Sequence, residues 1–194
     1  MATTELTATA PAMGLTRAYQ HAARCELRSI ARAAVGLIAA TALGVVLELA
    51  DHDLFSSIPP HPTLLPTVGA ISSIFVTNLR IVAVPFILIA FRFPAASSTR
   101  TAGDLILTGI LFANTARIGL AIGRWQTQLV PYLPHLPLEY LAISVAAGAW
   151  LSARYRAARG SQQELRTTLT HAGVAVVLLA VAASVEVLLT PHAR

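Results

Sequence analysis

Long hydrophobic stretches alternate with short polar stretches along the chain. A helix of ~20 residues crosses ~30 Å of hydrocarbon, so apolar stretches of about this length predict membrane-spanning helices. The pattern predicts an all-α fold, a polytopic transmembrane helical bundle of about five spans that occupies residues 33–191. We place the spans approximately at residues 33–50, 68–91, 102–123, 138–151 and 169–189.

Three segments need separate interpretation. Residues 1–14 are small and polar, which favours a disordered tail. Residues 15–32 carry several arginines and a partial apolar face, which predicts an interfacial amphipathic helix leading into the first span. The fourth stretch, residues 138–151, is short for a straight crossing. It spans only if the helix extends at one end, and a partly re-entrant segment is the alternative.

The composition agrees with a membrane protein. Of the 194 residues, 55% are hydrophobic and only 12% are charged, about half the ~25% of a typical soluble domain. We therefore expect a multi-pass protein of the cell inner (plasma) membrane, in contact with membrane lipid.

The basic residues, which are all arginines, cluster in alternate polar segments. Four arginines precede the first span, two lie between the second and third spans, and four lie between the fourth and fifth. Since cytoplasmic loops carry the excess of basic residues, this distribution predicts a cytoplasmic N-terminus and an outside C-terminus. The arginines do not form one basic stripe, so we expect no nucleic-acid partner.

Polar and charged residues interrupt the predicted spans or lie at their edges. Hydrocarbon does not solvate such groups, so together they predict a polar seam inside the bundle. Glu139 and Glu186 are the natural partners for Arg80 and Arg117. A structural network of ion pairs and amides is the favoured interpretation, and a substrate or ion path is the alternative. The candidate residues are Asn78, Arg80, Asn114, Arg117, His135, Glu139 and Glu186.

His135 and Glu139 are four residues apart, so they share a helix face if the helix includes His135. This pair is compatible with metal binding or proton transfer. Two residues do not make a zinc site, however, and the sequence shows no evident third ligand. We therefore expect a structural cap, with no metal, no cofactor and no catalytic residue. The chain also lacks the common nucleotide-binding and hydrolase motifs.

Small residues recur in the predicted spans and allow close approach of helices, within the chain or between copies. A homodimer is the default expectation, because two-fold symmetry is the commonest. The residues of this kind are Gly36, Gly44, Gly109, Ala113, Ala116, Gly119, Ala146, Gly148 and Ala149.

Several of these sequence runs resemble the stage II sporulation protein M family of integral membrane proteins. The run from Phe75 to Ile81 resembles its Asn-containing second span, and the run from Leu111 to Gly119 resembles its third conserved stretch. Residues 133–143 resemble its Pro-His-Gly-x-x-Glu-x-x-Ala-Ile motif, with Leu136 in place of the glycine. Glu186 resembles its acidic residue near the C-terminus. The resemblance covers roughly residues 27–191.

The resemblance implies an all-helical bundle with a scaffold role, in which a membrane platform anchors other proteins such as cell-wall enzymes. Some members of the family occur beside the ATPase components of transport systems. The expected function is therefore a non-enzymatic membrane subunit or scaffold of a larger complex. The first alternative is the permease subunit of an ABC-type exporter with a separate cytoplasmic ATPase. The second is an intramembrane enzyme component that uses His135 and Glu139.

Overall fold

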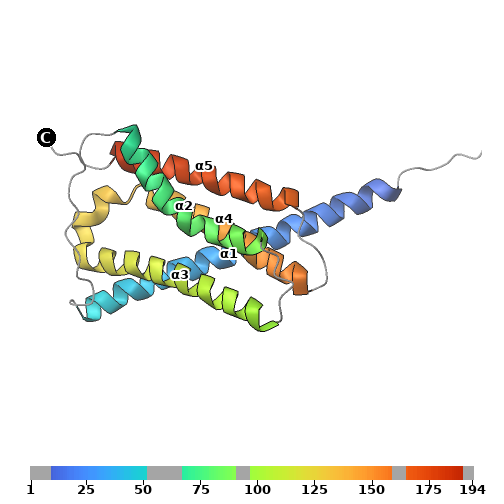
Figure 1. Ribbon diagram of the computed structural model, residues 1–194, viewed down its shortest axis with the longest axis horizontal. Coiled ribbons are helices and arrows are strands. Elements are labelled where there is room, and N and C mark those ends of the chain that lie inside the picture. The colour runs from blue at the N-terminus through green and yellow to red at the C-terminus, as the bar shows by residue number, and fades with distance from the viewer. Residues whose placement is uncertain (1–9, 52–66, 91–96, 159–164, 190–194) are drawn as a thin grey trace, which may run out of the picture.

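A computed structural model describes residues 10–51, 67–90, 97–158 and 165–189 of the chain. In these residues the secondary structure is helical throughout, which confirms the predicted helical bundle. Five long α-helices and one 3₁₀-helix are present in this part of the chain (Figure 1). They are α1 (Ala10–Ala50), α2 (Val68–Ala90), α3 (Ser97–Trp125), η1 (Gln126–Tyr132), α4 (Leu136–Ala158) and α5 (Leu165–Leu189).

All five α-helices contain a segment that is long and apolar enough to cross a membrane. Large hydrophobic side chains lie on the outside of the bundle: Ile38 is 60% exposed, Leu105 68% and Val177 62%. Soluble monomers rarely expose large contiguous apolar surfaces, whereas a lipid-facing surface is apolar. The chain is thus a multi-pass membrane protein by the length and composition of its helices.

The helices run alternately in opposite directions along the long axis of the molecule (Figure 1). α4 lies at the centre, where it packs against α1, α2 and α5. Half of its membrane segment is buried inside the bundle, more than for any other described helix. α2 packs on α4 and α5 and has only a small contact with α3.

The largest helix contact joins α1 to α3, and glycines of both helices take part in it. A Cβ atom on Gly44 would collide with the carbonyl oxygen of Ala116, and one on Gly119 would collide with the carbonyl oxygen of Thr41. A Cβ on Gly148 of α4 would lie 2.6 Å from the side chain and 2.7 Å from the backbone of Ile30 in α1. At Gly44 and Gly119, the backbones of α1 and α3 therefore approach each other with no side chain between them.

Other small residues of the sequence pattern play no such role. A Cβ on Gly36 or Gly109 would meet no atom within 4 Å, and both glycines are exposed. Helix spacing alone does not distinguish a glycine at a contact from a glycine on the lipid face.

Two sequence predictions about the N-terminal region need correction. Residues 10–14, which we assigned to a disordered tail, belong to α1. The interfacial helix predicted at residues 15–32 is not separate from the first span, because α1 is one helix of 41 residues. No proline or glycine separates the two segments between Cys25 and Val35, so helix formation continues through the basic stretch. Figure 1 shows the N-terminal end of α1 projecting beyond the other helices.

The fourth span is longer than predicted. α4 begins at Leu136 and ends at Ala158, so its 23 residues suffice for a full crossing, and the re-entrant alternative is wrong. The sequence prediction stopped at residue 151 because charged residues follow. Two of these, Arg154 and Arg156, form ion pairs with Asp104 of α3 and Glu26 of α1, which allows the helix to continue.

Candidate functional site

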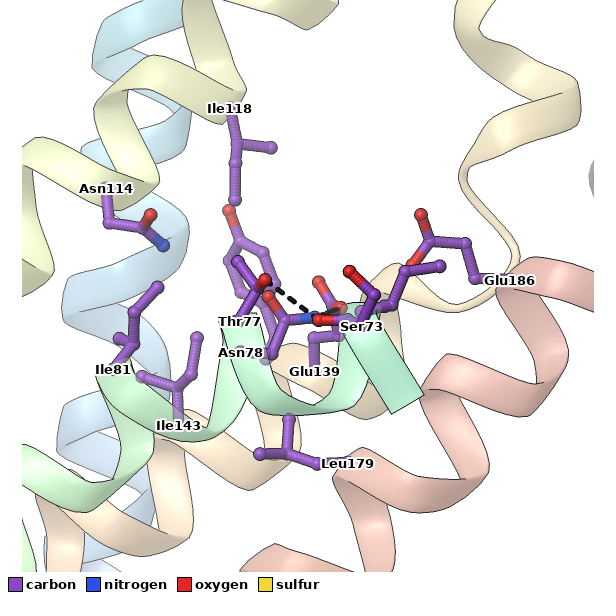
Figure 2. Close-up of a pocket in the computed structure, with 12 residues that line it drawn as sticks. Ser73, Thr77, Asn78, Ile81, Asn114, Ile118, Glu139, Ile143, Leu179 and Glu186 are labelled. Carbon is purple, nitrogen blue, oxygen red and sulfur yellow. Dashed lines mark hydrogen bonds between the residues drawn. The ribbon is translucent and has the colours of Figure 1, made fainter. Parts of the chain in front are cut away.

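A polar cavity of about 350 Å³ lies between α2, α3, α4 and α5. Figure 2 shows Asn78 and Glu139 meeting in its middle, with Asn114 on one side and Glu186 on the other. Isoleucines and a leucine complete the wall. Its polar lining consists of Ser73, Thr77, Asn78, Asn114, Glu139, Tyr140 and Glu186. The cavity therefore collects four of the seven seam residues.

Asn78 of α2 and Glu139 of α4 are directly bonded. The Asn78 side-chain amide donates a hydrogen bond to Oε1 of Glu139, across 61 residues of sequence. The amide holds this carboxylate in a fixed orientation and leaves Oε2 free to face other groups. The hydrogen bond also joins two predicted membrane spans, α2 and α4.

His135 lies directly before α4, at the edge of the cavity. Its carbonyl oxygen accepts hydrogen bonds from the N–H groups of Leu138 and Glu139, so it forms the first turn of the helix. This agrees with the predicted cap. The imidazole Nε2 lies 4.0 Å from Oε2 of Glu139 and 3.7 Å from Oε2 of Glu186.

The imidazole of His135 is largely buried, with 13% of its side chain exposed. Burial lowers the pKa of His135 below its usual value, because the charged form loses solvation. Nδ1 of this ring is buried and has no hydrogen-bond partner in the described part of the structure. The site therefore contains a buried imidazole beside two glutamate side chains.

Arg80 and Arg117 do not join this site, which corrects the predicted seam. Both are exposed on the outer surface of the bundle, and within the described ranges neither forms an ion pair with Glu139 or Glu186. The geometry of α2 explains this: Asn78 and Arg80 are two residues apart, and such positions lie on nearly opposite helix faces. In α3, Asn114 lines the cavity, whereas Arg117 one turn later points outward.

Two further polar contacts hold the helices around the cavity. Thr41 of α1 donates a hydrogen bond to the carbonyl of Thr115 (3.3 Å), and it is also hydrogen-bonded to the hydroxyl of Tyr140. Thr41 thus connects α1 to both α3 and α4. Threonine in an apolar helix commonly bonds to its own backbone, so this role is not visible in the sequence.

Sequence reasoning also missed several acidic and basic residues that pair across helices. Glu48 of α1 is completely buried, and Nη1 of Arg124 approaches its Oε1 at 3.8 Å. At the other end of the bundle, Glu26 pairs with Arg156, and its other oxygen lies 3.8 Å from Nε2 of His171. Glu26 and Glu48 both occur near the ends of an apolar run. An acidic residue at such a position predicts an ion pair with another helix, but the sequence does not show which residue is the partner.

The arrangement can bind a positively charged or hydrogen-bonding group. Two glutamate side chains, two asparagine amides and one imidazole surround or border one cavity inside the bundle. The same groups can stabilise the bundle without any ligand. Comparisons of the chain with protein-family models, with curated proteins and with solved structures found no match, so the resemblance to the stage II sporulation protein M family rests on the sequence runs alone.

Proposed function

We propose that this chain is a non-enzymatic membrane subunit, or scaffold, of a larger complex in the bacterial inner membrane. The observation that supports this most directly is the outward position of Arg80 in the middle of a span. Arg80 lies ten residues before the end of α2, which corresponds to about 15 Å along the helix axis. It is exposed on the surface of the isolated bundle.

An arginine at this depth is unfavourable against lipid. Insertion scales give at least ~2.5 kcal/mol for an arginine near the centre of a span. Arg117 of α3 is a second exposed arginine inside a span. A partner helix with a carboxylate at the same depth would offset both the charge and the lost solvation. The partner we propose is therefore another membrane protein with an acidic residue inside one of its spans.

The experiment is an affinity purification of the tagged chain from membranes in mild detergent, with mass spectrometry of the proteins that accompany it. We expect a membrane partner that Arg80→Leu removes or weakens. The matched control is Val177→Leu on α5, at an exposed apolar position, which should leave the partner in place. If the wild type and Arg80→Leu retain the same proteins in equal amounts, the proposal is wrong for this residue. Purification of the chain alone contradicts the subunit role.

The second candidate is the permease subunit of an ABC-type exporter. The polar cavity supports it, because Asn78, Asn114 and Glu186 come from three helices and face one space inside the apolar bundle. Under this hypothesis a cytoplasmic ATPase accompanies the chain in the same purification. A cell-wall enzyme or another membrane protein without an ATPase favours the scaffold.

A further inference from the structure

Three ligand-type side chains converge beside the cavity from separate parts of the sequence. One nitrogen of His135 and one oxygen each of Glu139 and Glu186 all lie within 4.8 Å of one another. The sequence offers the first two as an i, i+4 pair. The third comes from α5, 47 residues further along the chain, and only the fold brings it to the pair.

The distances are too long for these three groups to satisfy one another. Nε2 of His135 lies 3.7 Å and 4.0 Å from the two carboxylate oxygens, beyond the ~3.2 Å limit of a good N–H···O hydrogen bond. A metal ion with ligands at ~2.0–2.2 Å instead separates its donor atoms by roughly 3.3 Å in tetrahedral geometry. The observed separations of 3.7 and 4.0 Å are therefore only slightly longer than those of a coordination site.

The two neighbouring glutamate side chains also favour a cation. Glu139 and Glu186 lie close together at the end of the bundle where α4 begins and α5 ends, and two ionised carboxylates repel each other there. The arginines expected to compensate them, Arg80 and Arg117, face outward instead. His135 is the basic side chain that the described structure places beside both carboxylates. A divalent cation with two carboxylates and one neutral imidazole gives a site of zero net charge.

We propose that Nε2 of His135 and Oε2 of Glu139 and Glu186 bind a divalent first-row transition-metal ion. Imidazole suits zinc, iron, nickel and copper, whereas magnesium and calcium prefer oxygen ligands alone. The absence of a thiolate or thioether in this donor set disfavours monovalent copper. This role goes beyond the proposed subunit function and does not depend on any partner.

The neighbouring residues fit a site with an open coordination position. Three protein ligands leave at least one position of a tetrahedral ion for water or a solute, as in zinc sites that react or exchange. Glu139 and Glu186 both line the polar cavity, so the open position has access to it. Asn78 acts as a positioning residue, because its hydrogen bond to Oε1 of Glu139 directs Oε2 toward the other two ligands.

A second His–Glu pair in the molecule provides the contrast. Nε2 of His171 lies 3.8 Å from Glu26, a separation similar to those at the proposed site. The other oxygen of Glu26 accepts a hydrogen bond from Arg156, so an arginine already compensates this carboxylate. Among the described residues, this pair also has no third ligand beside it. His171 is therefore the matched control for His135.

The test is metal binding by the full chain in detergent, with its affinity tag removed and the protein stripped by a chelator. Co²⁺ is titrated and followed by visible absorption, and Zn²⁺ is titrated by calorimetry. We expect one Co²⁺ per chain, displaced by one Zn²⁺. His135→Gln and Glu186→Gln should each weaken binding by at least about a hundredfold, and Asn78→Leu by roughly tenfold, the low end for residues that orient a ligand. His171→Gln should not change it.

The proposal is overturned if the wild type shows no saturable binding at one ion per chain. It is also overturned if folded His135→Gln or Glu186→Gln binds as tightly as the wild type. Where a ligand variant does not remain monodisperse, the wild type loaded with one equivalent of Cu²⁺ decides the matter by electron paramagnetic resonance. Hyperfine coupling of the copper electron spin to one imidazole nitrogen supports the site, and coupling to several nitrogens or to none rejects it.

Discussion

The side-chain amide of Asn78 on α2 donates a hydrogen bond to the carboxylate of Glu139 on α4. The two residues are 61 positions apart, and the bond lies between two of the helices long and apolar enough to cross a membrane. It therefore serves two purposes: it joins α2 to the central helix, and it fixes the orientation of a carboxylate that borders the polar cavity.

Replacement of Asn78 should destabilise the bundle. Asn78→Leu removes the donor and leaves the Glu139 carboxylate partly buried without it, a change that costs ~1–3 kcal/mol or more for a charged group. We expect a lower midpoint of thermal unfolding in detergent. Asn114→Leu is the matched control, since Asn114 lines the same cavity but forms no hydrogen bond with another described residue. Equal loss of stability in both variants would argue against a special role for the Asn78–Glu139 bond.

The glycines of the α1–α3 contact should not tolerate larger residues. A Cβ on Gly44 or Gly119 would collide with a backbone carbonyl oxygen of the facing helix, and backbone atoms cannot move aside as a flexible side chain does. Gly44→Leu and Gly119→Leu should each destabilise the protein by more than the ~1–3 kcal/mol of ordinary overpacking. The measurement is the unfolding midpoint, together with the yield of monodisperse protein.

Gly36→Leu and Gly109→Leu provide the controls for this prediction. Both glycines belong to the same two helices, and both have open space where a Cβ would be built. These variants should keep or slightly raise stability, since glycine is a poor helix former. A similar loss in all four variants would mean that helix propensity or insertion, and not the close contact, determines the effect.

The ion pair between Glu26 and Arg156 should couple α1 to α4. Both side chains are about four-fifths buried, so solvent screens them less than an exposed pair. We expect Glu26→Gln and Arg156→Gln to be non-additive in a double-mutant cycle, with a coupling free energy of about 1 kcal/mol. The cycle is measured by unfolding in detergent. Strict additivity of the two substitutions would show that the pair does not hold these helices together.

The sequence was sufficient for the fold class because each crossing requires a long apolar run, and this signal is strong. Helix ends were less predictable. Arg154 and Arg156 suggested that α4 had ended, whereas ion pairs with residues of other helices keep them within it. Local sequence cannot show such compensation, because the acidic partners lie 50 and 130 positions away.

The members of the polar seam were predictable from the sequence, but their contacts were predictable only in part. A polar residue inside a span indicates a need for a partner, but not the direction in which the side chain points. Asn78, Asn114, Glu139 and Glu186 meet at one cavity, whereas Arg80 and Arg117 point away from it. The angular offset between Asn78 and Arg80 was available from helix geometry. The proximity of Glu186 to His135 was not, since it depends on how α5 packs beside α4.

The orientation in the membrane remains a prediction from the arginines, and cysteine labelling tests it. In a Cys25→Ser background, Gln128→Cys places a thiol on η1 and Ala158→Cys places one at the end of α4; both positions are exposed. Arginines cluster near Ala158 and not near Gln128, so the cytoplasmic excess of basic residues puts Ala158 inside and Gln128 outside.

In intact cells, a membrane-impermeant maleimide should label Gln128→Cys and not Ala158→Cys. Disruption of the membrane should make both reactive, which controls for buried thiols. Labelling of Ala158→Cys alone in intact cells would invert the topology, and would place the His135–Glu139–Glu186 cluster at the cytoplasmic end of the bundle instead of the outer end.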